Sequence, residues 1–364
     1  MTDVVVLGAG YAGTGAVKRL EEELPSGTQL TWISEQDYHL VLHEVHRVIR
    51  DADVESKVSI PVTEIKDRST RFVEGHVEDV DVEERVVSMA DGSDHGYDYL
   101  VVALGSATAF YGIEGLREHS LTLKGLDDAH EIREATLDAA ADASPSDPAH
   151  VIVGGAGLSG IQASGELAEL RDERNLPVDI SLVEGLDEVF PGNDPELQGA
   201  LRKRLLDADI DIMTGDFISR VDDETVYVGG GEDEDPEELD YDVLVWTGGI
   251  TGQEEVADAE VDKDERSNRI HAESDFQTSD DRVFALGDSA LIEQGPEDIA
   301  PPTAQAAWQA AEVAGENLAR RVRGQPLTEW THKDKGTVVS VGEKAVAHDV
   351  VYFPLTTFGG TPAK

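Results

Sequence analysis

A glycine-rich turn of the form G-x-G-x-x-G occurs twice in this chain, each time between an apolar run and a helical stretch. The first copy spans residues 8–13 and the second spans residues 155–160. In such a turn the first glycine permits a tight bend, the second lets the backbone approach a pyrophosphate, and the third lets helix pack on strand. The phosphates then lie at the helix N-terminus. Each copy therefore predicts a βαβ unit that binds a dinucleotide.

The sequence around each turn has the periodicity that this unit requires. In the first copy a strand is expected at 3–8, a helix at 14–24 and a second strand at 29–34. In the second copy a strand at 150–154 leads into the glycine loop, a helix follows the loop through about residue 174, and a second strand lies at 178–183. An Ala/Asp/Ser/Pro-rich linker at 140–150 separates the copies. We therefore predict an α/β fold with two Rossmann-like dinucleotide-binding domains. The glycine-rich acidic segment 229–240 is expected to be a solvated hairpin tip without chemistry.

An acidic residue after the second strand of such a unit can accept hydrogen bonds from both ribose hydroxyls and repel a 2′-phosphate. In the second copy Glu184 ends that strand, and no Arg or Lys lies near it in sequence to pair a 2′-phosphate. This favours NAD over NADP. In the first copy the candidate is Glu35, one position later than Ser34, where the usual register would place the acid.

The amino-acid composition excludes several kinds of site and partner. The chain has no cysteine, which excludes disulfides, thiolate nucleophiles, iron–sulfur clusters and cysteine zinc sites. Its net charge is −47, from 76 Asp and Glu against 29 Lys and Arg. Such a surface repels phosphate backbones, so we expect no nucleic-acid partner. The even spread of acids is typical of proteins from halophiles, where multimolar salt shortens the screening length to about 3 Å.

The same sequence contains no apolar run of about 18 residues, the length that spans a bilayer. Its N-terminus lacks the basic region and apolar stretch of a signal peptide. We therefore expect a cytoplasmic protein.

With these motifs in place, the chain resembles the two-dinucleotide-binding flavoproteins, and among them the type II NADH:quinone oxidoreductases. Residues 97–106 resemble the segment that returns the chain to the FAD adenosine, and residues 283–288 resemble the late FAD motif. Residues 112–129 resemble the crossover between domains, and residues 304–309 resemble the family's A-Q-x-A-x-Q helix. The similarity extends over nearly the whole chain.

This resemblance implies two cofactors, FAD and NADH, and a set of residues for each. The residues expected to hold FAD are Gly8, Gly10, Gly13, Glu35, Ala103, Gly105, Gly287, Asp288 and Gln305. Those expected to hold NADH are Gly155, Gly157, Gly160, Glu184, Gly248 and Gly249. The Asp288 carboxylate is expected to hydrogen-bond the ribityl chain of FAD, the alternative being a helix N-cap.

The implied architecture is a pair of three-layer ββα domains with a β-rich C-terminal segment. The FAD domain is discontinuous, at 1–115 and 270–325, the NADH domain lies at 116–269, and the C-terminal segment lies at 326–364. The family closes with an amphipathic membrane segment, and this sequence ends where that segment is expected to begin. Peripheral contact with the inner face of the cell membrane then depends on a tail not present here, and truncation and another mode of docking both stay open. A homodimer also stays open.

The implied activity is oxidation of NADH with two-electron transfer through FAD to a quinone, by a ping-pong mechanism, in a respiratory chain. Gln305 and Gln309 share one helical face and are expected to hydrogen-bond quinone carbonyls, the alternative being an Ala-rich packing helix. Gln162 stands where the family often has a Glu considered for proton handling. We expect Gln162 to belong to the catalytic region, with the proton role passing to another group or to water.

Three histidines, His39, His43 and His46, are spaced at i, i+4 and i+7. On one helical face they would suit zinc, and His43 or His46 would also suit a proton donor beside the flavin. We expect instead surface or cofactor-packing histidines, and no metal site.

Two other functions remain as alternatives. A ferredoxin or rubredoxin reductase of the same fold is disfavoured because no basic docking patch is evident. A flavin- and NAD-binding sensor without turnover is disfavoured by the intact second fingerprint. Disulfide reductases and sulfide:quinone oxidoreductases depend on redox thiols, and the absence of cysteine argues against both.

Overall fold

The computed structural model describes residues 2–231, 234–296, 298–351 and 356–360. By its internal contacts the chain divides into two compact units, which we describe separately. The first unit comprises Met1–Leu42, Ser56–Ala107 and Ile250–Asp334. The second comprises His43–Glu55, Thr108–Gly249 and Lys335–Lys364.

A five-stranded parallel sheet with the order β20-β9-β1-β2-β5 forms the centre of the first unit. Its strands are β1 (Thr2–Leu7), β2 (Thr28–Ser34), β5 (Arg71–Glu74), β9 (Tyr99–Val102) and β20 (Val283–Ala285). The apolar run Val4–Leu7 is buried, as expected for a strand covered on both faces. A second, antiparallel layer consists of β6 (Val77–Asp81), β7 (Val86–Met89) and β8 (Asp94–Gly96).

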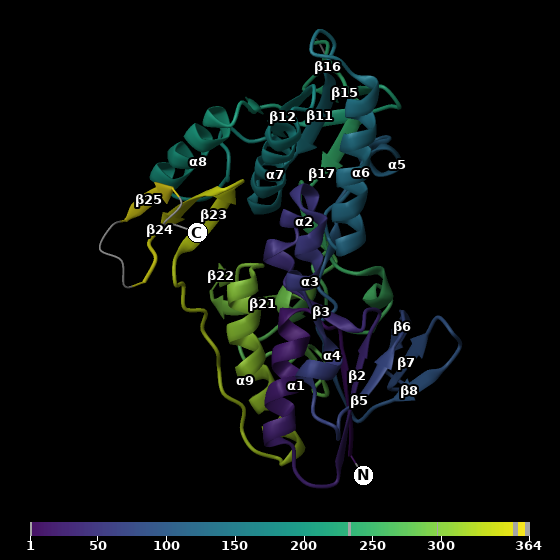
Figure 1. Ribbon diagram of the computed structural model, residues 1–364. Helices are drawn as coiled ribbons and strands as arrows, with labels where there is room; N and C mark the ends of the chain where they lie inside the picture. Colours follow the sequence, from purple (N-terminus) through teal and green to yellow (C-terminus); the bar gives the residue numbers. More distant parts are fainter. Residues whose placement is uncertain (1, 232–233, 297, 352–355, 361–364) are drawn as a thin grey trace. The chain divides into compact units, whose positions relative to one another are not determined.

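Helices α1 (Tyr11–Glu23) and α9 (Ala304–Val322) lie side by side in this unit (Figure 1). Small residues permit the close approach, because a Cβ added at Gly15 would lie 2.6 Å from the Cβ of Ala311. The other elements of the unit are β3 (Tyr38–Leu40), β4 (Ser59–Pro61), α4 (Val62–Ile65), β18 (Ile250–Thr251), η3 (Glu254–Val256), β19 (Ile270–Ala272), η4 (Gly287–Ser289), β21 (Ala290–Gly295) and β22 (Asp298–Ile299).

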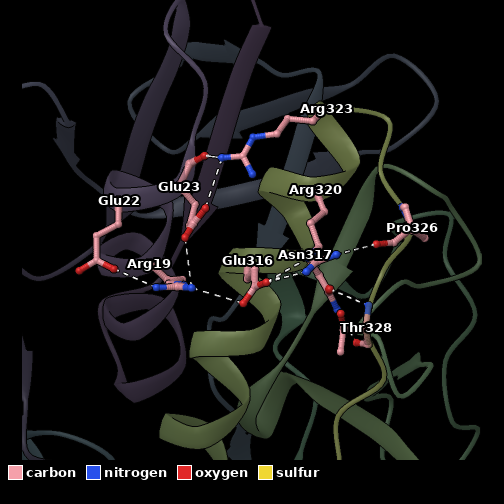
Figure 2. A network of polar contacts seen from close by, with 9 residues as sticks. All are labelled: Arg19, Glu22, Glu23, Glu316, Asn317, Arg320, Arg323, Pro326 and Thr328. Carbon is pink, nitrogen blue, oxygen red and sulfur yellow. Dashed lines mark hydrogen bonds and ion pairs between the residues drawn. The ribbon is translucent and has the colours of Figure 1, made fainter.

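A polar network joins α1 to α9 along their exposed sides, as Figure 2 shows. Arg19 forms ion pairs with Glu23 at 3.2 Å and with Glu316 at 3.3 Å. Glu316 also accepts a hydrogen bond from Arg320 at 3.0 Å, and Arg323 reaches back to Glu23. The ends of both helices are therefore tied by charge as well as by packing.

A four-stranded parallel sheet with the order β13-β12-β11-β17 forms the centre of the second unit. Its strands are β11 (Ala149–Gly154), β12 (Val178–Glu184), β13 (Asp211–Thr214) and β17 (Val243–Trp246). Helices α6 (Leu126–Asp142) and α7 (Leu158–Arg174) pack on it. An antiparallel sheet of β14 (Ile218–Val221), β15 (Thr225–Val228) and β16 (Glu237–Asp240) forms the further layer.

The C-terminal strands belong to this second unit. The strands β23 (Thr337–Val341), β24 (Lys344–His348) and β25 (Thr357–Gly360) form an antiparallel sheet that contacts α7 and α8 (Pro195–Asp207). The remaining elements are α2 (Arg47–Arg50), η2 (Ala52–Val54) and α5 (Leu116–His119). Three short elements fall at the boundaries between the units: η1 (Leu42–Glu44), α3 (Glu55–Val58) and β10 (Ala107–Thr108).

The predicted α/β fold with two Rossmann-like units is confirmed. The expected hairpin tip at 229–240 is shorter in the structure, because residues 237–240 form β16, which pairs with β15. Residues 232–233 of the expected tip lie outside the described residues. Among the boundaries between the two units are 107/108 and 249/250. These boundaries describe how the backbone is divided and do not show which cofactor each unit binds.

Candidate functional site

The two glycine loops have nearly the same geometry at their first glycine. Gly8 has a φ of +98° and Gly155 has a φ of +93°, in the region that favours glycine. A Cβ at Gly8 would lie 2.2 Å from the carbonyl oxygen of Ala103, and one at Gly155 would lie 2.7 Å from the Cα of Gly248. Each loop therefore bends tightly against the end of a neighbouring strand.

The second and third glycines also correspond. A Cβ at Gly13 would lie 2.0 Å from the oxygen of Gly8, and one at Gly160 would lie 1.9 Å from the oxygen of Gly155, so both close the contact between helix and strand. By contrast, an added Cβ at Gly10 or Gly157 meets no atom of the described residues within 4 Å. These two glycines are the N-caps of α1 and α7. Open space at a helix N-terminus is the cradle that a pyrophosphate requires, and both loops fit one.

The register of the second strands shows which residues correspond. The amide of Gly8 donates to the oxygen of Ile33, and the amide of Gly155 donates to the oxygen of Val183, both at 2.8 Å. Ser34 therefore occupies the position that Glu184 occupies in the other unit. The acids proposed for the two ribose sites are not equivalent.

Glu184 is held at its glycine loop by main-chain donors. Its Oε2 accepts a hydrogen bond from the amide of Ala156 at 2.7 Å, and its Oε1 accepts one from the amide of Leu186 at 3.0 Å. Each carboxylate oxygen retains a lone pair for a further donor, such as a ribose hydroxyl.

Glu35 has a different environment. Its side chain is 65% exposed, and its Oε1 lies 3.7 Å from Nδ1 of His76. His76 also lies 3.7 Å from Glu255 through Nε2. The first unit thus presents an exposed carboxylate where the second presents one held by two amides, and the ribose role of Glu35 stays a prediction.

A cavity of about 590 Å³ opens beside the second glycine loop. Five predicted NADH residues line it: Gly155, Gly157, Glu184, Gly248 and Gly249. Gly160 lies beneath the loop at the contact with its first glycine. The structure thus brings the whole predicted set together within one unit.

The cavity also has aromatic and apolar walls that the sequence did not reveal. Phe217 and Leu186 line it although they are 64% and 50% exposed. The Phe217 ring lies on Gly185, where an added Cβ would be 2.1 Å from the ring. Such an exposed apolar surface beside Glu184, the acid predicted to bind the ribose, is a suitable platform for a flat base. Their spacing in the sequence carries no signal, because they come from different loops.

Tyr111 also lines this cavity and is 69% exposed. It has a φ of +53°, unusual for a residue with a side chain. A Cβ at Gly249, whose φ is +143°, would lie 1.9 Å from the Tyr111 hydroxyl. A glycine is therefore required for the tyrosine to lie over this strand end.

In the first unit, the residues expected to hold FAD meet at the ends of three strands. Ala103 donates through its amide to Leu7 at 3.0 Å, which holds the end of β9 next to β1. The hydroxyl of Ser289 donates to the oxygen of Gly105 at 3.0 Å. Gly287 has a φ of +68°, and a Cβ there would lie 2.8 Å from that of Ala12 in α1. The late motif is thus placed beside the glycine loop.

Asp288 lies inside the short helix η4, whose N-cap is Leu286. The alternative of a helix N-cap for this residue is therefore wrong, because the cap position precedes it by two residues. The carboxylate role toward a ribityl chain remains as the prediction.

Arg269 supports this turn and was missed from the sequence. Its side chain donates to the main-chain oxygen of Asp288 at 2.8 Å and to that of Ala290 at 2.6 Å. Arg269 is 6% exposed, and burial lowers the pKa of its guanidinium while the charges of Asp288 and Asp264 oppose that shift. No motif surrounds this arginine, so the sequence offered no signal for it.

Gln305 and Gln309 lie on one face of α9, as their spacing predicts. The amide nitrogen of Gln309 is 3.4 Å from Oε1 of Gln305. Gln309 also exchanges two hydrogen bonds with the backbone of Lys333, at 3.0 and 3.1 Å. Gln309 therefore braces the chain that follows α9.

Gln162 belongs to the second unit, whereas Gln305 and Gln309 belong to the first. Its side chain is 8% exposed and donates to Oγ of Ser340 at 3.2 Å. The same hydroxyl lies 3.1 Å from Nε2 of His46. The glutamine thus joins α7 to β23 in a buried polar chain.

The three histidines fall on separate elements: His39 in β3, His43 in η1 and His46 at the N-cap of α2. The single helical face that a three-histidine zinc site needs does not form. Within the described ranges, no group of three or more His, Asp or Glu residues is arranged to hold a metal ion. Likewise, none of the helices described is both long and apolar enough to cross a membrane.

Residues 2–311 match the family described as pyridine nucleotide-disulphide oxidoreductase. A type II NADH:quinone oxidoreductase of Staphylococcus aureus is 28% identical over 364 residues, covering 96% of this chain and 88% of the relative. The structure of NDH2 from Plasmodium falciparum in complex with NADH has a TM-score of 0.83 at 17% identity, covering 99% of this chain and 91% of that one. The sulfide:quinone oxidoreductase of Aquifex aeolicus has a TM-score of 0.81 at 19% identity, covering 100% and 88%.

Proposed function

This chain belongs to the pyridine nucleotide-disulphide oxidoreductase family, and from that premise we propose that it is an FAD-dependent NADH:quinone oxidoreductase. The observation that carries the proposal is the pair of matching glycine loops, each with open space at the N-cap of its helix. The relative named type II NADH:quinone oxidoreductase, which aligns with 96% of this chain, supports the same activity.

We assign FAD to the first unit and NADH to the second. The strand ends carrying Gly8, Ala103 and Gly287 support the first assignment, because they converge beside one helix N-terminus. The cavity beside Glu184 supports the second. In sequence terms, the FAD domain comprises 1–115 and 270–325, the NADH domain 116–269 and the C-terminal segment 326–364.

FAD, when bound, supplies the redox chemistry by taking a hydride from NADH and delivering two electrons to a quinone in separate half-reactions. The protein's own residues bind and orient. Glu184 accepts the ribose hydroxyls of NADH and rejects a 2′-phosphate by charge. Arg269 fixes the turn that presents Asp288. Gln305 donates to an acceptor carbonyl, and Gln309 braces the chain that follows α9 through the backbone of Lys333.

The disulphide chemistry in the family's description does not apply to this chain. Reduction of a disulfide proceeds through thiolate attack and a mixed disulfide, which needs protein cysteines. The sequence has none. Electrons therefore leave for an acceptor without passing through a protein thiol.

We also propose that the protein is cytoplasmic, that it contacts the membrane peripherally, and that it is a monomer or a homodimer.

The test uses the purified protein in multimolar KCl, without oxygen. The visible flavin band is recorded, NADH is added, and a short-chain quinone follows. We expect bleaching by NADH and recovery with quinone. Bleaching by NADH without recovery on quinone addition would contradict the quinone step and indicate a protein acceptor such as a ferredoxin. The absence of bleaching would indicate a flavin-binding protein that does not oxidise NADH.

A further inference from the structure

Two buried polar side chains contact the carbonyl oxygen of Ala9, which lies inside the first glycine loop. His39 places Nδ1 at 2.8 Å from this oxygen, and Thr14 places Oγ1 at 3.1 Å. His39 is 5% exposed and Thr14 is 3% exposed. Neither side chain belongs to the glycine motif, and the mechanism above does not use them.

The chemistry of the carbonyl settles where the protons are. A carbonyl oxygen only accepts hydrogen bonds, so Nδ1 of His39 must carry a hydrogen and the Thr14 hydroxyl must donate as well. The two donors lie 3.3 Å apart, Nδ1 to Oγ1, and converge on one oxygen. The edge-to-face packing of Tyr11 on the His39 ring, at 4.9 Å between centroids and 81°, fixes the ring in this orientation.

Two donors on one carbonyl affect the other end of the same peptide group. The C=O of Ala9 and the N–H of Gly10 form a single amide, and hydrogen bonds to the oxygen polarise that amide and strengthen its N–H as a donor. Gly10 is the N-cap of α1 and borders the open space of the loop. The side chains therefore act on the peptide that faces the phosphate cradle.

The second loop provides an internal control. There the equivalent carbonyl, that of Ala156, accepts a hydrogen bond of 2.8 Å from the main-chain amide of Phe190. The residue equivalent to Thr14 is Ile161, whose side chain has no hydrogen-bond donor. The same carbonyl is thus held by two side-chain donors in one loop and by a main-chain donor in the other.

We propose that His39 and Thr14 are positioning residues for the pyrophosphate of FAD. They orient and polarise the peptide between Ala9 and Gly10 so that the first loop retains its dinucleotide, whereas the second loop, without such side chains, releases its own at each turnover. The inference rests on the proposed function in taking FAD as the ligand of the first loop.

The experiment measures how tightly the holoenzyme retains FAD in three variants. His39→Leu and Thr14→Val each remove one donor of the pair, and His39→Asn replaces the imidazole with an amide N–H near the position of Nδ1. We expect FAD dissociation constants raised about five- to tenfold in the first two variants, the loss typical of one buried hydrogen bond, and close to wild type in His39→Asn. The 31P NMR signals of bound FAD should shift in the same two variants, while the KM for NADH of the flavin-saturated enzyme stays unchanged.

A matched control is His348→Asn, which changes a buried histidine of the second unit and should leave FAD retention unchanged. Unchanged retention in both His39→Leu and Thr14→Val would overturn the inference, as would equal weakening in His39→Asn and His39→Leu. If His39→Leu does not fold, Thr14→Val and His39→Asn still decide the question. Wild-type protein that binds no FAD would instead overturn the proposed function itself.

Discussion

The two glycine loops share a backbone and differ in what holds it. Their first glycines have φ angles of +98° and +93°, and their second glycines border open space. In the first loop, side chains hold the carbonyl of Ala9. In the second loop, the carboxylate of Glu184 holds the amide of Ala156. The motif therefore fixes the path of the loop, while residues outside it hold the peptide groups of the two loops in different ways.

The largest effect should come from filling the two cradles. A Cβ at Gly10 or Gly157 meets no described atom within 4 Å, so valine at either position leaves the fold intact but occupies the space of the pyrophosphate. We expect Gly10→Val to purify without flavin. We expect Gly157→Val to keep its flavin but to raise the KM for NADH by about a hundredfold or more. Absorbance spectra and steady-state kinetics measure both.

Gly125→Val is the matched control for this pair. Gly125 is the N-cap of α6 and also has no described atom within 4 Å of an added Cβ, but it lies in neither loop. It should retain both the flavin and the wild-type KM. If Gly10→Val kept its FAD, the assignment of FAD to the first loop would be wrong.

The next effect concerns the acids, which occupy different registers. Replacing Glu184 by the residue at the equivalent position of the first unit, Glu184→Ser, removes the carboxylate that we propose accepts from the ribose hydroxyls and repels a 2′-phosphate. The ratio of kcat/KM for NADH over that for NADPH should fall about 10- to 100-fold, as expected for lost hydrogen bonds to a charged group. Kinetics with both nucleotides measure it.

The corresponding change in the first unit is Glu35→Ser. Because the Glu35 side chain is 65% exposed, FAD retention should change much less than NADH binding does in Glu184→Ser. An equal effect in the two units would contradict the distinction drawn from their registers.

A smaller effect is expected at the platform beside Glu184. Phe217→Ala should raise the KM for NADH about five- to tenfold, the range for loss of stacking under one base. The melting temperature should stay unchanged because the side chain is 64% exposed. Leu206→Ala, an exposed apolar residue on α8 that does not line the cavity, is the control and should leave the KM unchanged. If Phe217→Ala and Leu206→Ala had similar KM values for NADH, Phe217 would not belong to the NADH site.

The sequence predicted those parts of the fold and site that depend on local order. The glycine loops, their flanking strands and helices, and the neighbourhood of Gln305 and Gln309 follow from spacing along a strand or helix. His39, Arg269 and Phe217 could not be predicted in this way. Each contacts its partner across a gap in sequence, His39 with Ala9, Arg269 with Asp288 and Phe217 with Gly185, and tertiary folding alone brings these pairs together.

The smallest effect tests whether charge between α1 and α9 helps the first unit hold its ligand. The hydrogen bond from Arg320 and the nearby Arg19 keep the pKa of Glu316 below its ordinary value of 4.5. A carboxylate whose folded pKa is depressed stabilises the fold above its unfolded pKa, and this contribution disappears as the pH falls toward the folded pKa. The temperature of flavin release should therefore drop as the pH falls below 4.5, and less steeply in Glu316→Gln. Since this side chain is 34% exposed, the contribution is about 0.5 kcal/mol and decreases with salt.

The control variant is Asp207→Asn, which removes an exposed ion pair with Lys203 in the second unit and should leave flavin release unchanged. An identical pH profile in wild type and Glu316→Gln would show that packing of small residues such as Gly15 against Ala311, rather than charge, joins these two helices.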